Sequence, residues 1–196
     1  MRCAWPWGED DRMTYAVKGQ KFSTLFTWFD QDGDGRLTQE DMRGTADVFA
    51  GVAARGDEAD LAAMRDAFGQ WWRLLLTHGD TDGDGRVSRE EFVTVMEREV
   101  TSPEHFEGAV MAIIDALMNA LDTDGDGVLS RDEYVRMYDA LGIPPQRSGE
   151  AFTRLDLDGN GVISRDEFRT AVSDFYLSAD PDAPGNYLLG PVGPSA

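Results

Sequence analysis

The sequence predicts an all-α fold in which about eight helices form four helix–loop–helix units, arranged as two paired lobes of one compact body. Three observations support this prediction. A twelve-residue acidic segment occurs four times, starting at residues 30, 80, 122 and 156. Apolar residues recur at helical spacing on both sides of each copy. No long polar linker separates the halves, and the 196 residues are 41% hydrophobic, which is enough for a core.

The third copy, DTDGDGVLSRDE at residues 122–133, has the pattern of an EF-hand calcium loop. Calcium is a hard cation that takes about six to eight oxygen ligands. Glycine at the sixth loop position permits the sharp turn around the ion. The expected ligands are three aspartate carboxylates, one backbone carbonyl and one bidentate glutamate: Asp122, Asp124, Asp126, Val128 and Glu133.

The other copies read DQDGDGRLTQED (30–41), DTDGDGRVSREE (80–91) and DLDGNGVISRDE (156–167). A single DxDG segment is compatible with a polar surface turn. Four copies, each with Gly at the sixth position and an aliphatic residue at the eighth, leave almost no room for that interpretation. The expected ligands occupy the same five positions, with the seventh again giving its carbonyl: Asp30, Asp32, Asp34, Arg36 and Asp41 in loop one; Asp80, Asp82, Asp84, Arg86 and Glu91 in loop two; Asp156, Asp158, Asn160, Val162 and Glu167 in loop four.

The four loops are not equal in their ligands. Loops one, two and three each carry four acidic ligands, whereas loop four has Asn160 at its fifth position and should attract calcium a little less. Loop one ends in Asp41, which is one methylene shorter than Glu and reaches a large ion with more difficulty. We therefore expect three to four bound Ca²⁺ ions, with loop 30–41 binding calcium weakly or favouring Mg²⁺.

The eighth and ninth loop positions carry a second pattern. The eighth residues are aliphatic and suit short strands that pair one loop with another: Leu37, Val87, Leu129 and Ile163. The ninth residues are Ser or Thr, three before the final acid, which is the spacing of a helix-capping box: Thr38, Ser88, Ser130 and Ser164. The final acid of each loop can thus serve both the ion and the start of the next helix.

In chain order, residues 1–12 resemble nothing else in the sequence. They are interpreted as a flexible extension, or as the product of an upstream start codon with the true start at Met13, with a docking motif at Trp5-Pro6-Trp7 as the alternative. Residues 13–100 are predicted to hold the first EF-hand pair. Its first helix runs from Tyr15 to Phe29, and a helix leaves loop one over Met42–Ala54.

Gly56 is predicted to break that helix, and Asp57 to cap the next one. Gly79 directly precedes loop two, where an apolar residue is more usual, so this entering helix is expected to end early. Ser102-Pro103-Glu104 marks a stop and a restart, and residues 101–177 hold the second pair.

Residues 178–196 are rich in Pro, Gly and Ser, which is typical of a disordered tail. Tyr187, Leu188 and Leu189 interrupt that composition. The alternative is therefore that this segment folds back and fills an apolar groove of the body.

The net charge of −19 argues against binding to nucleic acid or to anionic membranes. Fifteen of the 37 acidic residues are expected ligands, and four calcium ions would reduce the net charge to about −11. Cys3 is the sole cysteine, so no internal disulfide forms. We see no signal peptide and no apolar run long enough for a membrane span, and we expect a cytoplasmic monomer.

The long gap between the first two loops, the run DFYLSADPDAPGNYLLG at 174–190 and four loops in one short chain resemble the sarcoplasmic calcium-binding proteins, including their prokaryotic calerythrin type from actinobacteria. The resemblance covers about residues 13–190 and implies a compact two-lobed fold with the C-terminal segment packed on the body. It also implies high-affinity calcium binding for buffering or transport. One loop is commonly degenerate in that family, whereas here only Asp41 departs from the pattern.

Calcium buffering is the leading functional hypothesis. The alternative is a calcium sensor that captures a protein target in a Met-lined groove, although the spacing of six methionines favours ordinary packing: Met42, Met64, Met96, Met111, Met118 and Met137. An enzyme or chromophore carrier is a third class with little support. His78 and His105 are expected to be structural or solvated, Trp71-Trp72 is expected to belong to the core, and no catalytic motif occurs.

Overall fold

The computed structural model describes residues 9–53, 58–180 and 183–188, with side chains from residue 17 onward. The Trp5-Pro6-Trp7 motif, the predicted break at Gly56, the predicted cap at Asp57, and Leu189 lie outside these residues. Among the helices that are described, none is long and apolar enough to cross a membrane.

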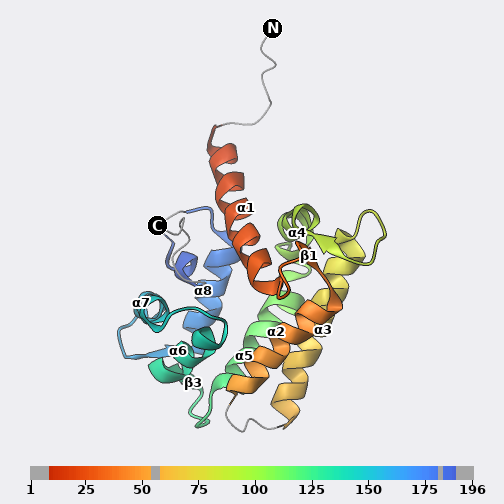
Figure 1. Ribbon diagram of the computed structural model, residues 1–196. Coiled ribbons are helices and arrows are strands. Elements are labelled where there is room, and N and C mark those ends of the chain that lie inside the picture. Colours follow the sequence, from red (N-terminus) through yellow and green to blue (C-terminus); the bar gives the residue numbers. More distant parts are fainter. Residues whose placement is uncertain (1–8, 54–57, 181–182, 189–196) are drawn as a thin grey trace.

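The first half places a helix before and after each of its two loops (Figure 1). In order, its elements are α1 (Glu9–Phe29), β1 (Arg36–Leu37), α2 (Gln39–Val52), α3 (Glu58–Gly79), β2 (Val87–Ser88), α4 (Arg89–Val95) and the π-helical turn η1 (Met96–Val100). Helix α1 begins six residues before the predicted Tyr15, so the predicted boundary after residue 12 falls inside it. Three acidic residues at 9–11 suit a helix N-terminus, which explains the earlier start.

Helix α3 does not end early, as Gly79 led us to predict. It runs through Gly79, and a Cβ built on that glycine would lie 3.2 Å from Cγ1 of Val95. Gly79 is therefore suited to the close approach of α4 rather than to a helix break. That packing partner lies 16 residues further along the chain, so local sequence did not reveal it.

The second half repeats the arrangement and adds a C-terminal turn. Its elements are η2 (Glu107–Met111), α5 (Ala112–Leu121), β3 (Val128–Ser130), α6 (Arg131–Ala140), α7 (Pro145–Leu155), β4 (Val162–Ser164), α8 (Arg165–Leu177) and the 3₁₀ turn η3 (Pro184–Tyr187). The predicted stop and restart near Ser102 is confirmed: the chain turns over 101–105, and the carbonyl of Ser102 accepts from the Phe106 amide at 2.9 Å.

Short antiparallel ribbons join the loops in pairs, as the eighth-position residues predicted. Strand β1 pairs with β2, and β3 pairs with β4. The register sets Leu37 opposite Val87 and Leu129 opposite Ile163, and all four side chains are fully buried. Each ribbon therefore fixes two loops side by side, because its central side chains belong to the core.

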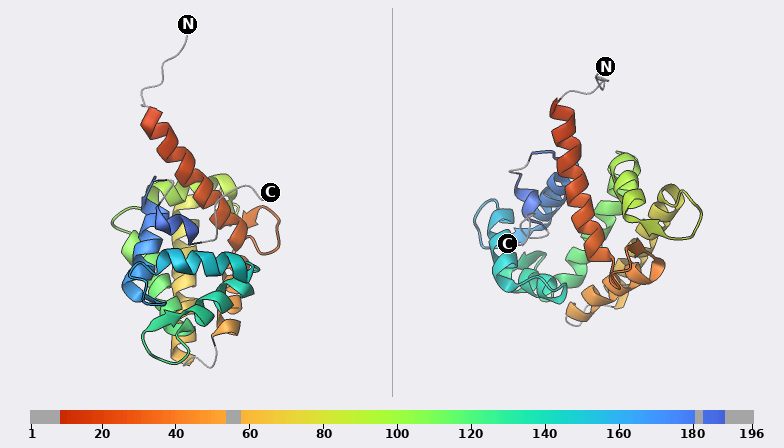
Figure 2. Two further views of the ribbon diagram at one scale, coloured as in Figure 1. Left: turned by 90° about the vertical axis from the view of Figure 1, so that its left-hand side faces the viewer. Right: turned by 45° about the horizontal axis from the view of Figure 1, so that its top comes forward.

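The two halves share one hydrophobic core, which confirms the predicted all-α, compact fold. Helix α3 packs against α5, and α2 packs against α6. Helix α1 lies between the halves and contacts both α4 and α8 (Figure 2). Its buried Lys21 donates to the carbonyl of Ser178 at 2.9 Å, just beyond the end of α8. Burial, together with the nearby Lys18, lowers the pKa of Lys21.

The C-terminal segment packs on the second half, so the prediction of a disordered tail is wrong for residues 183–188. Turn η3 lies against α7 and α8, and the hydroxyl of Tyr138 donates to the carbonyl of Leu188. A Cβ on Gly185 would lie 2.2 Å from the carbonyl oxygen of Ala171, so only glycine fits this contact. The buried side chain of Leu188 belongs to the core cluster, which is the fold-back that Tyr187 and Leu188 suggested.

Candidate metal sites in the four acidic loops

Each loop brings three of its predicted ligand carboxylates together. In every loop the acids at positions one, three and twelve have oxygen atoms within 4.8 Å of one another: Asp30, Asp32 and Asp41; Asp80, Asp82 and Glu91; Asp122, Asp124 and Glu133; Asp156, Asp158 and Glu167. The fifth-position acids Asp34, Asp84 and Asp126 lie outside these clusters. The seventh-position residues stand in or directly before a strand, at the edge of the ribbon: Arg36, Arg86, Val128 and Val162.

The first aspartate of each loop organises the turn. One of its oxygens accepts from the amide of the sixth-position glycine, at 3.0 Å in loops one and two, 2.8 Å in loop three and 2.9 Å in loop four. Gly127 has φ of 86°, a left-handed conformation that glycine adopts without strain. The loop is thus wound around the carboxylate that is expected to meet the ion.

The final acid of each loop is held by both ends of the loop. Oε1 of Glu91 accepts from the amide and hydroxyl of Thr81 at 2.9 and 2.6 Å, and Oε2 accepts from the amide of Ser88 at 2.9 Å. Burial by itself raises the pKa of Glu91, but the hydrogen bonds from Thr81 and Ser88 outweigh it and hold this pKa at about 2. The carboxylate is therefore charged at neutral pH.

The same contacts recur in the second half. Burial opposes them there too, yet hydrogen bonds from Thr123 and Ser130 lower the pKa of Glu133, and those from Ser164 and the backbone of residues 157 and 158 lower that of Glu167. All four ninth-position residues form capping boxes with the final acid, as predicted. Each final acid therefore connects its loop to the first turn of the next helix.

Loop one keeps this network despite its shorter final acid. Asp41 is buried, and its two oxygens accept from the amides of Gln31 at 3.1 Å and Thr38 at 2.8 Å. Oδ1 of Asp30 is also buried, and no hydrogen-bond partner for it exists among the described residues. An anionic oxygen buried without a donor is unfavourable unless a cation meets it, so the donor set of loop one fits a hard metal ion.

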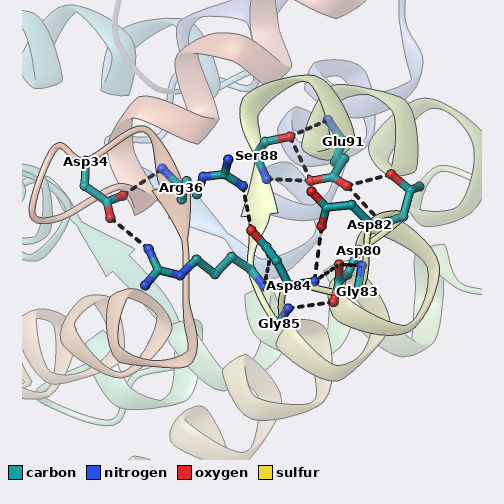
Figure 3. Close-up of polar contacts among 11 residues, drawn as sticks. Asp34, Arg36, Asp80, Asp82, Gly83, Asp84, Gly85, Ser88 and Glu91 are labelled. Atoms are coloured by element: carbon teal, nitrogen blue, oxygen red, sulfur yellow. Dashed lines mark hydrogen bonds and ion pairs between the residues drawn. The ribbon is translucent and has the colours of Figure 1, made fainter.

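Two ion pairs cross between loops one and two (Figure 3). Nη1 of Arg36 lies 2.8 Å from Oδ2 of Asp84, and Nη1 of Arg86 lies 3.6 Å from Oδ2 of Asp34. We expected only the backbone carbonyls of these arginines to matter. Their side chains could have been found from the sequence, because the predicted pairing of Leu37 with Val87 places each seventh position beside the opposite loop.

The two histidines also come together, which the sequence did not reveal. The rings of His78 and His105 are 5.4 Å apart, and Nδ1 of each lies 4.0 Å from the same carboxylate oxygen of Glu99. Nδ1 of His105 is also 3.2 Å from the carbonyl oxygen of Glu99. This cluster lies outside the four carboxylate groups.

Comparison with known families matches both halves of the chain. The EF-hand domain pair family matches residues 20–97, and the EF hand family matches residues 113–138 and 150–173. A calcium-binding protein from Streptomyces coelicolor is 30% identical, covers 83% of this chain and 99% of its own, and superimposes with a TM-score of 0.69. The chain therefore belongs to the EF-hand family and is a calcium-binding protein.

Two further structures share its fold. A sarcoplasmic calcium-binding protein from amphioxus is 20% identical, covers 89% of this chain and 96% of its own, and has a TM-score of 0.70. The coelenterazine-binding protein of Renilla muelleri is 26% identical, covers 91% of this chain and 97% of its own, and has a TM-score of 0.65. No curated protein sequence matches significantly. The overall fold is thus that of the sarcoplasmic calcium-binding proteins, as the resemblance implied.

Proposed function

We propose that each of the four loops binds one calcium ion and that the protein acts as a calcium buffer in the cytoplasm. Each ion would take carboxylates from positions one, three and twelve, the fifth-position side chain and the seventh-position carbonyl. The support is the convergence of three carboxylates in every loop, together with the hydrogen bonds that keep the final acids charged. Because these carboxylates share one small space, a divalent cation relieves their mutual repulsion.

The observation that favours a buffer over a sensor is the closed interior. Among the described residues, the exposed large hydrophobic side chains are Leu157 and Leu177. Turn η3 and Leu188 cover the second half, and the six methionines that a sensor would present are all buried. A target helix needs an open apolar groove, so this surface offers it little to bind.

A sensor remains the second candidate because of one relative. The Streptomyces coelicolor protein is described in terms of prokaryotic calcium-mediated regulation, and it is 30% identical to this chain. A sensor needs calcium to expose an apolar groove, and in the second half that means moving the C-terminal segment that packs on α7 and α8. The hydrogen bond from Tyr138 to Leu188 opposes that movement.

The small interior cavity supports a buffer over a carrier of a large chromophore. It lies between the halves, is lined by residues such as Trp71, Tyr138 and Leu188, and has a volume of about 90 Å³. An engineered apolar cavity of about 150 Å³ holds only a molecule the size of benzene. A cavity smaller than that is better explained as imperfect packing around Trp71.

Two measurements on the full chain test the proposal. Calorimetric titration should give at least three calcium ions per chain, with loop one the weakest site, and two or fewer would overturn the assignment of ligands. An apolar dye that fluoresces on exposed hydrophobic surface separates the two roles. We expect its fluorescence to fall when calcium is added to protein in chelator, because the ion tightens the fold; a rise would favour the sensor.

A further inference from the structure

Loops one and two are tied together by charged side chains, whereas loops three and four are not. Arg36 forms an ion pair with Asp84, the fifth-position acid of loop two, and Arg86 forms one with Asp34, the fifth-position acid of loop one (Figure 3). The seventh positions of the second pair are Val128 and Val162 instead. Asp126, the fifth-position acid of loop three, forms no ion pair with any described residue; its oxygen accepts from the Val128 amide at 3.0 Å.

The ribbon explains why each arginine reaches across. Arg36 stands opposite Ser88 in the antiparallel register, which brings its side chain over loop two. The backbone amide of Arg36 donates to Oδ1 of Asp34 in its own loop at 2.8 Å. Its guanidinium donates to Oδ2 of Asp84 in the other loop, also at 2.8 Å. One residue therefore contacts the fifth-position acids of both loops.

We propose that Arg36 and Arg86 set the calcium threshold of the first pair, so that loop three fills before loop two although their ligand sets are the same. The inference rests on calcium binding by these loops. An incoming ion must share the Asp34 or Asp84 carboxylate with a guanidinium, and it is repelled by the same positive charge. In the second pair both seventh positions are valines, so neither cost arises from them; the guanidinium of Arg136 contacts loop three at the Thr123 hydroxyl, at 3.4 Å, and not at Asp126.

The effect is modest because the ion pairs are partly solvated. The side chains of Arg36 and Asp84 are 40% and 36% exposed. Exposed pairs contribute up to about 1 kcal/mol, which corresponds to a change of about two- to fivefold in a dissociation constant. The sign is opposite to that expected from counting acids, which gives the first pair eight ligand carboxylates and the second pair seven.

The Arg36→Val variant is the direct test, with calcium titrated by ¹H–¹⁵N NMR. The amide of Gly85 donates to Asp80, so its resonance reports loop two, and that of Gly35 reports loop one through Asp30. We expect half-saturation at Gly85 to need about two- to fivefold less calcium, with a smaller change at Gly35. Arg65→Val is the control, because it removes the same charge but pairs with Asp47, outside the loops.

The reverse change can be made in the second half. By the same register, an arginine at position 162 faces Asp126 of loop three, whereas one at position 128 faces Asn160, which carries no charge. Val162→Arg should therefore weaken loop three about two- to fivefold, and Val128→Arg should weaken loop four less.

The outcomes separate this inference from the proposed function. Calcium binding to wild type with no change in Arg36→Val, or an equal change in Arg65→Val, overturns the role of the arginines alone. No calcium-dependent shift at any loop glycine of the wild type would instead overturn calcium binding by the loops.

Discussion

Loops two and three form a comparison within the chain itself. Both begin DTDGDG, and in both the second-position threonine donates its amide to the final glutamate, at 2.9 Å for Thr81 and 2.7 Å for Thr123. They differ in the residue across the ribbon: Arg36 of loop one forms an ion pair with Asp84 of loop two, whereas Val162 of loop four holds the corresponding position beside loop three. Identical ligands thus have different electrostatic surroundings, because the neighbour across the ribbon carries a charge in one pair and none in the other.

Removing the final acid should give the largest loss of calcium affinity, and this loss should be equal in loops two and three. Glu133→Gln or Glu91→Gln replaces a bidentate carboxylate with an amide that offers one neutral oxygen. Changes in residues that only support a metal ligand cost about 10- to 100-fold in affinity, so losing the ligand itself should cost at least about 100-fold. The titrations of the Gly127 and Gly85 amides measure it loop by loop. Unchanged affinity in either loop would show that its final acid is not a ligand.

The C-terminal segment offers the next contrast, because its turn η3 packs on helices α7 and α8 of the second half. Gly185→Ala forces a methyl group against the backbone of Ala171 and should destabilise the protein by about 1–3 kcal/mol. Urea unfolding measures this loss, and increased dye fluorescence would report exposure of the groove under Leu188.

Gly51→Ala is the matched control for that substitution. A Cβ on Gly51 in α2 meets no atom within 4 Å, so alanine should stabilise the helix by about 1 kcal/mol. Equal effects of the two substitutions would mean that the segment does not depend on close packing at Gly185.

Loop one should respond to a longer final acid. Asp41→Glu adds the methylene that the other three loops have and should raise the preference for calcium over magnesium in this loop by roughly tenfold, the lower end of the effects of changes around a bound metal. Competition titrations with Mg²⁺, read at the Gly35 amide, measure the ratio. An unchanged ratio would mean that the backbone of loop one already compensates for the short side chain.

Raising the salt concentration should give the smallest change in the relative calcium affinities of loops two and three. Raising the ionic strength from about 0.1 M to 1 M shortens the screening length from about 10 Å to 3 Å. The exposed Arg36–Asp84 pair weakens, so the ratio of loop three to loop two affinities should move toward one by about twofold or less. A ratio that widens with salt would contradict an electrostatic origin.

The sequence predicted the structural features that depend on residues close together in the chain. The twelve-residue loops, the ribbons at Leu37 and Val87, and the capping boxes at Ser88 and its counterparts all follow from local spacing. The structure was needed where distant segments meet. Gly79 continues its helix because Val95 packs on it, and Gly185 fits only against Ala171.

In the candidate metal sites, too, contacts within one loop were predictable and contacts between loops were not. The acids at positions one, three and twelve converge as predicted, while the fifth-position acids do not join them. Asp84 instead meets Arg36, 48 residues away in the chain. A motif read one loop at a time cannot show this contact, because the partner belongs to the other loop.

A calcium titration of the wild-type chain, followed at the amides of the four sixth-position glycines, tests the central claim most directly. Each of these amides donates to the first aspartate of its own loop, so four resonances report four sites: Gly35, Gly85, Gly127 and Gly161. We predict that all four shift and that Gly127 reaches half-change at about two- to fivefold less free calcium than Gly85. If Gly85 changes first, or together with Gly127, the arginines do not set the order of filling.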